Sequence, residues 1–212
     1  MASSRLVAPE LATIKVHGMT REAFLMRSTL AAGAAYGAMS ATGLISSALA
    51  DGASGDIEIL NFALTLEHLE HEFYERAAKQ VKGLSDYEAD LTKELRDNEK
   101  AHVDALTATI EKLGGQPAKK PTFDFGGALS NRKSYLKTAN TLEDTGVSAY
   151  NGAAPSIEST EVLAAAGSIV QIEGRHAALI RLVREVAPAP RAFDKASEME
   201  AVLKAVKPFI KG

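Results

Sequence analysis

The sequence contains no cysteine and no tryptophan, and only 6% of its 212 residues are aromatic. The absence of cysteine excludes disulfide bonds, thiolate catalysis and zinc sites built on thiolates. It leaves the cellular compartment open, because exported proteins can also lack cysteine. The net charge is only -3, and no basic stripe with interleaved aromatic residues occurs. We therefore expect no nucleic acid as a partner.

Alternating β-branched residues bounded by turns are also missing, which disfavours β-strands. From residue 56 onward, alanine, leucine, glutamate and lysine dominate, and these residues favour helices. A chain of 212 residues is long enough for one domain with a substantial core and an appendage. The fold class that we expect is all-α.

The N-terminal part of the chain has a different character. Residues 28–50 carry no charge, two arginines precede them, and Ala48–Ala50 form a small-residue cleavage pattern. We expect residues 1–50 to be a signal peptide cleaved after Ala50, and residues 51–212 to be an exported domain, either periplasmic or extracellular.

A membrane anchor is the alternative, because the uncharged stretch is long enough to span a bilayer. Its alanine, glycine and serine content makes it only weakly apolar, which favours the signal peptide. A membrane is therefore a partner only if the presequence is retained, as in a membrane-anchored subunit of a larger complex. The intact mass of the exported protein separates these two interpretations.

Four long helices and a short one are expected in the remaining chain. Apolar residues recur at three- and four-residue steps from Asp56, a candidate cap, to about Val81. Ser85 and Glu88 form a capping-box pattern for a second helix that ends at Gly114. Caps and breakers place the others at residues 131–151, from about residue 159 to before Pro188, and from Ser197, where Glu200 completes a capping box.

The connection between the second and third helices is long. About 17 extended residues reach roughly 55 Å, whereas a helix of about 27 residues is roughly 40 Å long. The connection can therefore run the whole length of a bundle. We expect a four-helix bundle with a long crossover between helices two and three.

Two Glu-x-x-His motifs occur, Glu99 with His102 and Glu173 with His176. A spacing of three places both side chains of a motif on one helix face, close enough to bind one ion. Each motif follows a lone glutamate by about thirty residues, Glu67 in the first half and Glu143 in the second. The halves therefore repeat one unit.

Heights along the helices support the first half, because Glu67 and Glu99 differ by roughly 3 Å when measured from the intervening turn. In the second half Glu143 is closer to its turn than Glu173 is, so the segment from Gly152 to Glu158 must absorb the difference.

Charge balance suggests what the repeated unit does. Four buried carboxylates without partners repel one another and are forced to take up protons, whereas two divalent cations cancel their charge. Iron or manganese suits carboxylate and imidazole ligands, and zinc also fits. The alternative is a bundle with solvent-facing glutamates and incidental histidines. The expected metal ligands are Glu67, Glu99, His102, Glu143, Glu173 and His176.

Some neighbouring residues have open roles. Glu70 is an extra ligand, a partner of a ligand, or a polar residue at the edge of the site. His71 is a ligand, a proton carrier or an interior histidine. Tyr74 and Tyr150 each lie two turns from a lone glutamate, where they either pack in the core or act in oxidant access or electron transfer.

The sequence resembles the ferritin-like superfamily, and more narrowly the ferritin-like family that includes the desiccation-related proteins of plants and bacteria. The similarity covers about residues 55–211. Its motifs are NFALTLEHLE with FY at residues 61–74, EKAH at 99–102, LEDTGV with AY at 142–150, EGRHAA at 173–178, AFD at 192–194 and PFI at 208–210.

This resemblance implies a ferritin-like bundle with two divalent metal ions, iron or manganese, acting on peroxide or dioxygen in stress protection. Relatives include ferroxidases, peroxide-consuming rubrerythrins and manganese catalases, so the reaction of an oxidoreductase stays open. The alternative is a non-enzymatic metal store or desiccation scaffold. A homo-oligomer is compatible with either.

Overall fold

The computed structural model describes residues 15–16, 19–20 and 45–211. The chain divides into two units, residues 1–47 and 48–212. In the first unit, β1 (Lys15–Val16) pairs antiparallel with β2 (Met19–Thr20). Most of the signal peptide expected at residues 1–50 lies outside the described residues. In the part of the chain that is described, no helix combines the length and the apolar character needed to cross a membrane.

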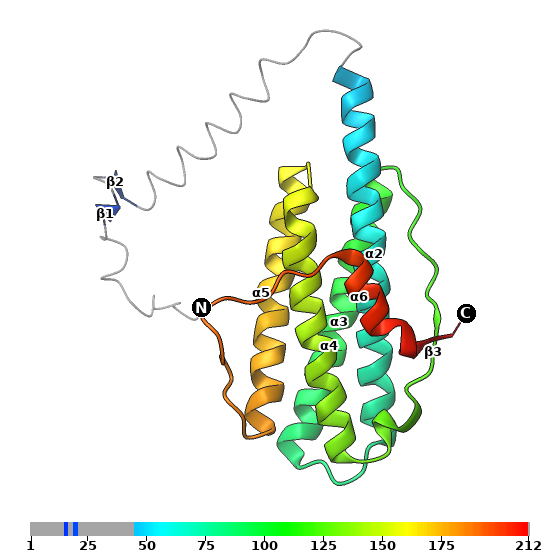
Figure 1. Cartoon of the computed structure of the whole chain (residues 1–212), viewed down its shortest axis with the longest axis vertical. Helices are drawn as coiled ribbons and strands as arrows, with labels where there is room; N and C mark the ends of the chain where they lie inside the picture. The colour runs from blue at the N-terminus through cyan, green and yellow to red at the C-terminus, as the bar shows by residue number, and fades with distance from the viewer. Residues whose placement is uncertain (1–14, 17–18, 21–44, 212) are drawn as a thin grey trace, which may run out of the picture. The chain divides into compact units, whose positions relative to one another are not determined.

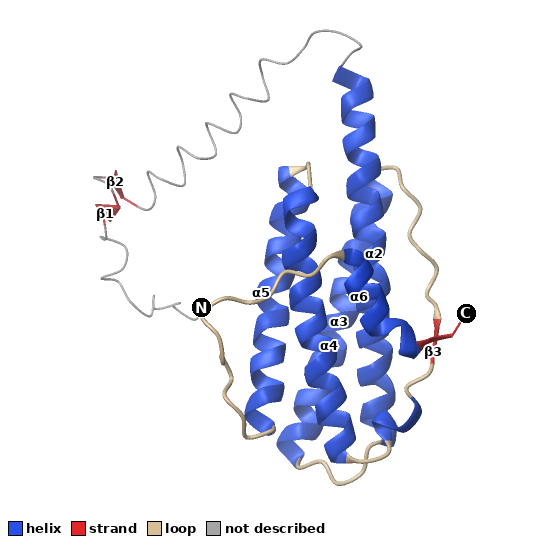
Figure 2. Ribbon diagram, viewed as in Figure 1, coloured by secondary structure: helices blue, strands red, loops and turns tan. Residues whose placement is uncertain are grey.

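The helical part of the chain is a four-helix bundle (Figures 1 and 2). Its long helices are α2 (Ile45–Gln80), α3 (Asp86–Lys112), α4 (Arg132–Ala153) and α5 (Thr160–Val183). A short turn makes α2 and α3 antiparallel, and the following crossover returns along α2, so that α4 starts at the same end as α3. The predicted all-α bundle with a long crossover between helices two and three is confirmed.

Three helix starts follow from local capping. The Ser85 side chain accepts a hydrogen bond from the Glu88 amide, and the Glu88 carboxylate accepts one from the Ser85 amide at 2.9 Å. Asn131 caps α4 through the Ser134 amide, and Ser159 caps α5. Each cap satisfies an amide that has no partner within its own helix.

The first helix begins earlier than the sequence predicts, at Ile45 rather than at Asp56. No proline interrupts residues 45–56, and the Asp56 carboxylate is used elsewhere. It accepts hydrogen bonds from the Glu158 and Ser159 amides, each at 2.9 Å. Asp56 is buried and ties α2 to the chain entering α5.

The expected C-terminal helix is present as α6 (Met199–Val206), but its predicted capping box is wrong. The helix follows Glu198, and no side chain caps it. The Ser197 amide donates to the Ser148 carbonyl on α4 at 2.9 Å, which holds Ser197 against the bundle instead.

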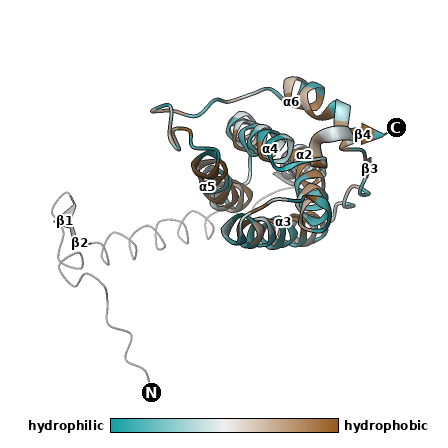
Figure 3. Ribbon diagram, turned by 90° about the horizontal axis from the view of Figure 1, so that it is seen from below, coloured by the Kyte–Doolittle hydropathy of each residue, from teal (hydrophilic) through white to brown (hydrophobic). Residues whose placement is uncertain are grey.

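The C-terminal segment also holds the crossover. Within the crossover, β3 (Thr122–Phe123) pairs antiparallel with β4 (Ile210–Lys211), and η2 (Gly126–Leu129) follows. The Asp124 amide donates to the Phe209 carbonyl at 2.9 Å. The end-on view in Figure 3 shows α6 on the outside of the bundle, beside α4.

The buried apolar residues form two clusters along the bundle. The first includes Phe73, Leu95, Tyr135, Leu142 and Ile180, and the second includes Leu64, Val103, Leu106, Val162 and Ile169. On each long helix, buried acidic or histidine side chains lie in sequence between members of the two clusters. The bundle therefore has a polar layer between two apolar ones.

Replacing Asp56 tests the link between α2 and α5. We expect Asp56→Ala to lower the free energy of unfolding by about 2 kcal/mol, because two amides lose a charged acceptor. Urea denaturation of the metal-free protein measures this. The exposed Glu58→Ala on the same helix serves as control and should change the value by less than about 0.5 kcal/mol. Equal effects of both substitutions would contradict this role of Asp56.

Candidate metal centre

All six residues predicted as ligands meet in the polar layer. Each of the four helices contributes at least one, and all six are buried, with the four glutamates 0% exposed. Their candidate ligand atoms form two groups in which all atoms lie within 4.8 Å of one another. The first group is Glu67, Glu99, His102 and Glu173, and the second is Glu99, Glu143, Glu173 and His176. The two groups share Glu99 and Glu173.

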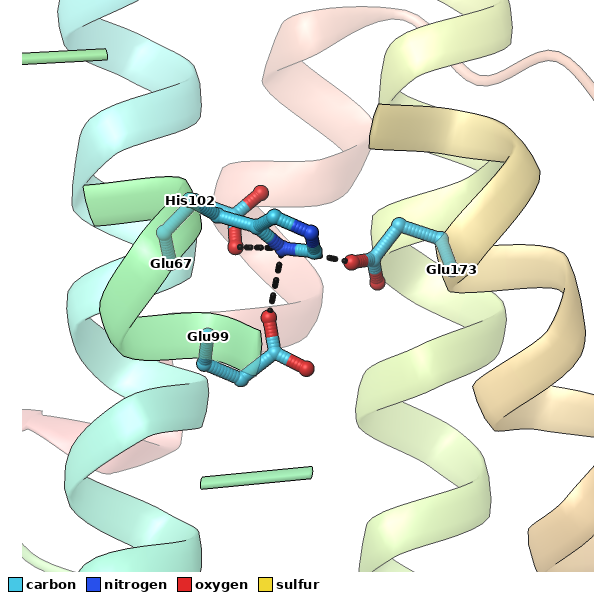
Figure 4. A group of neighbouring side chains, drawn as sticks. All are labelled: Glu67, Glu99, His102 and Glu173. Atoms are coloured by element: carbon cyan, nitrogen blue, oxygen red, sulfur yellow. Dashed lines mark hydrogen bonds and ion pairs between the residues drawn. The ribbon is translucent and has the colours of Figure 1, made fainter. Parts of the chain in front are cut away.

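In the first group, the imidazole of His102 is surrounded by three carboxylates (Figure 4). Its Nδ1 atom lies 2.9 Å from Glu99 Oε2, 3.2 Å from Glu67 Oε2 and 3.2 Å from Glu173 Oε1. Carboxylates from three helices therefore converge on one nitrogen, as expected of ligands that bind a common ion.

The second group is arranged in the same way around His176. Its Nδ1 atom lies 2.8 Å from Glu99 Oε1 and 3.5 Å from Glu143 Oε2. Glu143 thus reaches the level of His176, although the sequence spacing in this half fits less well. The segment between the helices includes η3 (Ala154–Ser156), a tighter helical turn.

Several buried polar atoms of this layer have no hydrogen-bond partner among the described residues. They are Glu70 Oε2, Glu99 Oε1, Glu143 Oε2, both carboxylate oxygens of Glu173, and His176 Nδ1. Although His176 Nδ1 is near Glu99 Oε1, the pair lacks hydrogen-bond geometry. Such groups are costly to bury without partners. Two cations bound to these oxygens and nitrogens would satisfy them, so the residues present fit a dinuclear metal site.

Burial and hydrogen bonding distribute protons unevenly over these side chains. Burial raises the pKa of Glu67 from 4.5 to about 7, and burial with the charges of Glu99 and Glu67 raises the pKa of Glu173 well above 4.5. For Glu99, the hydrogen bond with His102 and the nearby imidazole of His176 outweigh burial and lower the pKa to about 2.

The two histidines shift in the opposite direction to buried bases without partners. Burial alone would lower their pKa values, but hydrogen bonds to Glu67 and Glu99 raise the pKa of His102 to about 12, and the nearby carboxylates of Glu143 and Glu99 raise that of His176 to about 11. In the metal-free protein, protonated imidazoles therefore supply positive charge that metal ions would otherwise provide.

Two tyrosines connect the lone glutamates across the bundle. The Tyr74 hydroxyl on α2 donates to Glu143 Oε1 on α4, and the Tyr150 hydroxyl on α4 donates to Glu67 Oε1 on α2, the latter at 2.5 Å. Both rings are buried. The tyrosines thus pack in the core and also fix the orientation of two candidate ligands.

The sequence analysis missed Asn98, which neighbours Glu99 on α3. Its Nδ2 atom lies 3.1 Å from His176 Nε2. With the amide turned over, Asn98 Oδ1 would accept a hydrogen bond from the Nε2–H of His176, which leaves Nδ1 unprotonated for a metal ion. A single asparagine without a recognisable motif gives no signal for this role in the sequence.

The neighbours with open roles separate into two kinds. Glu70 is buried in the acidic layer. His68 and His71 are only half-buried and belong to neither ligand group. Burial lowers the pKa of His71, and Glu75 partly offsets it. The histidines that join the site are thus the two in Glu-x-x-His motifs.

Comparison with known proteins supports this arrangement. The chain is similar in structure to the crystal structure of ferritin-like, diiron-carboxylate proteins from Bacillus anthracis str. Ames, with a TM-score of 0.57 and 20% sequence identity. The match covers 62% of this chain and 96% of that one. No curated protein matches the chain. The family model of the ferritin-like domain matches residues 55–185, which include every residue of the acidic layer, and the chain belongs to this family.

Proposed function

We propose that the protein binds two iron or manganese ions in its acidic layer and performs redox chemistry on peroxide or dioxygen. The observation behind this proposal is the pair of buried ligand groups that share Glu99 and Glu173. Glu99 and Glu173 belong to both groups and would hold both ions, while His102 and His176 would each hold one.

The ligand chemistry supports redox-active metals. Carboxylate oxygens and imidazole nitrogens suit iron and manganese, and zinc is compatible with the same atoms. When bound, such ions would supply Lewis acidity and electron exchange to a small oxygen species. The diiron-carboxylate character of the similar Bacillus anthracis protein supports iron as the first candidate.

The protein side chains would control orientation and access. Tyr74 and Tyr150 hold Glu143 and Glu67 in place, and Asn98 positions His176. Burial of the whole layer excludes bulk water and large substrates. His102, with 8% exposure, is the most accessible of the six.

A non-enzymatic role is the second candidate, as a metal store or a desiccation scaffold. The complete burial of the four glutamates favours ions held for long times, which suits storage as well as catalysis. In both versions we place the protein outside the cytoplasm, in stress protection, on the basis of the presequence expected at residues 1–50.

Metal analysis tests the shared part of both candidates. We expect protein purified from its native source to contain about two iron or manganese ions per chain. Glu99→Ala combined with Glu173→Ala should remove both ions, because these residues reach both groups. The exposed pair Glu94→Ala with Glu161→Ala is the matched control on the same helices. A double variant at the shared glutamates that retains its ions and stability would defeat the proposal.

Turnover separates catalysis from storage. We expect the metal-loaded protein to disproportionate hydrogen peroxide to water and dioxygen repeatedly, or to reduce dioxygen repeatedly with ascorbate added as electron donor. The Glu99 and Glu173 double variant should show only the rate of free metal ions. Oxygen-electrode measurements follow both reactions. If the wild type keeps its ions but completes no more than one turnover, the storage role replaces the enzymatic one.

The pKa shifts predict a pH dependence of the metal-free protein. Glu67 binds its proton more tightly in the folded than in the unfolded chain between pH 4.5 and about 7, and the two histidines do so from pH 6.5 upward. The folded state thus binds more protons, so stability falls as pH rises across this range. Glu99 changes the pH dependence only below pH 4.5. Its lowered pKa stabilises the folded state above pH 4.5, and this stabilisation is lost as the pH falls toward 2.

We therefore expect the midpoint temperature of thermal unfolding of the metal-free protein to decrease as the pH rises from about 5.5 to about 8.5. Metal ions compete with the same protons, so the apparent metal affinity should rise over this range. Glu67→Gln cannot titrate and should show a shallower fall below pH 7. A midpoint of the metal-free wild type that rises with pH would contradict the assigned shifts.

A further inference from the structure

A fifth glutamate lies in the acidic layer beside the four expected ligands. Glu70 is 2% exposed, and its Oε2 atom has no hydrogen-bond partner among the described residues. No lysine, arginine or histidine of the described part forms an ion pair with it. A buried carboxylate in this state needs either a proton or a cation.

The internal repeat shows what is special about this position. Glu67 and Tyr74 on α2 correspond to Glu143 and Tyr150 on α4, with the same spacing of seven residues. Three residues after each lone glutamate, however, α2 has Glu70 and α4 has Gly146. At this position the first half therefore has an acid, and the second half has no side chain.

These two positions face each other in the structure. A Cβ atom at Gly146 would lie 3.2 Å from Glu70 Oε1, 3.6 Å from Glu70 Oε2 and 2.9 Å from Glu173 Oε2. α4 is a continuous helix through this residue, so no backbone irregularity requires the glycine. The missing side chain instead leaves space in which the Glu70 and Glu173 carboxylates approach the same point of α4.

We propose that Glu70 is a further metal ligand, completing the position formed by Glu99, Glu143, Glu173 and His176. The inference rests on the proposed function, since it requires bound ions. Along α2, Glu70 lies between Glu67 of the first group and Tyr74, whose hydroxyl donates to Glu143 of the second group. A side chain at Gly146 would meet both Glu70 Oε1 and Glu173 Oε2, so these two buried carboxylates border one space, where a cation would relieve their repulsion. Gly146 is the residue that admits this extra ligand.

The extra ligand makes the two metal positions unequal. Five carboxylates exceed the charge of two divalent cations by one, and a trivalent ion at one position would restore neutrality. Iron and manganese reach this charge, whereas zinc does not. Glu70 therefore favours iron or manganese over zinc in the proposed function, because peroxide or dioxygen can oxidise one Fe²⁺ or Mn²⁺ to the trivalent ion.

Manganese titration of the metal-free protein tests the inference, with the electron paramagnetic resonance signal of free Mn²⁺ as readout. We expect the wild type to bind two ions, and Glu70→Gln to keep the first and bind the second at least about tenfold more weakly. Gly146→Ala should weaken both ions, because its methyl group would meet Glu173, which both groups share, as well as Glu70. Glu75→Gln, one turn further on the same helix and paired with Lys79 outside the site, is the matched control.

Each outcome is decisive. If Glu70→Gln binds each of the two ions as tightly as the wild type does, Glu70 is not a ligand, and the proposed function still stands. A wild type that binds no manganese and no iron would defeat both. Circular dichroism of the metal-free variants reports folding, and Glu70→Gln should fold at least as stably as the wild type, because it removes a buried acid without a partner. If that variant does not fold, the same titration of Glu70→Ala decides.

Discussion

Repulsion among buried carboxylates is the constraint on which this structure depends. The four predicted ligand glutamates are fully inaccessible, and Glu70 is almost so. In a dry core such a cluster persists only if some carboxylates take up protons, or if protonated imidazoles or metal ions supply compensating positive charge. Apolar clusters on both sides of the layer supply the stability that this arrangement costs. The centre is thus a strained layer within an otherwise ordinary bundle.

The duplicated unit gives this layer its order. Each lone glutamate is held by a tyrosine from the opposite half, so that α2 and α4 stabilise each other's ligands. This exchange makes the two halves mutually dependent, because a shift of either helix disturbs a ligand on both. The two halves differ at Glu70 and Gly146, where α2 brings a carboxylate into the layer and α4 has no side chain.

Local patterns in the sequence were sufficient to predict the starts of three helices and the six residues that meet in the layer. Ser85, Asn131 and Ser159 cap helices through amides only three residues away, and motif spacing alone indicated the six residues that meet in the layer. Asp56 looked like a cap for its own helix, but it acts on a segment more than a hundred residues later.

The roles of Asn98 and of the two tyrosines also depend on how the helices pack, which a short stretch of sequence does not reveal.

Burial of the centre determines how ions can reach it. With every ligand shielded, an ion enters only while the helices are apart or during a local opening. Loading is then coupled to folding, and the ions available where the chain folds influence which metal it holds. The metal that the four-helix core holds would then depend on the compartment in which the chain folds and on the ions present there at that moment.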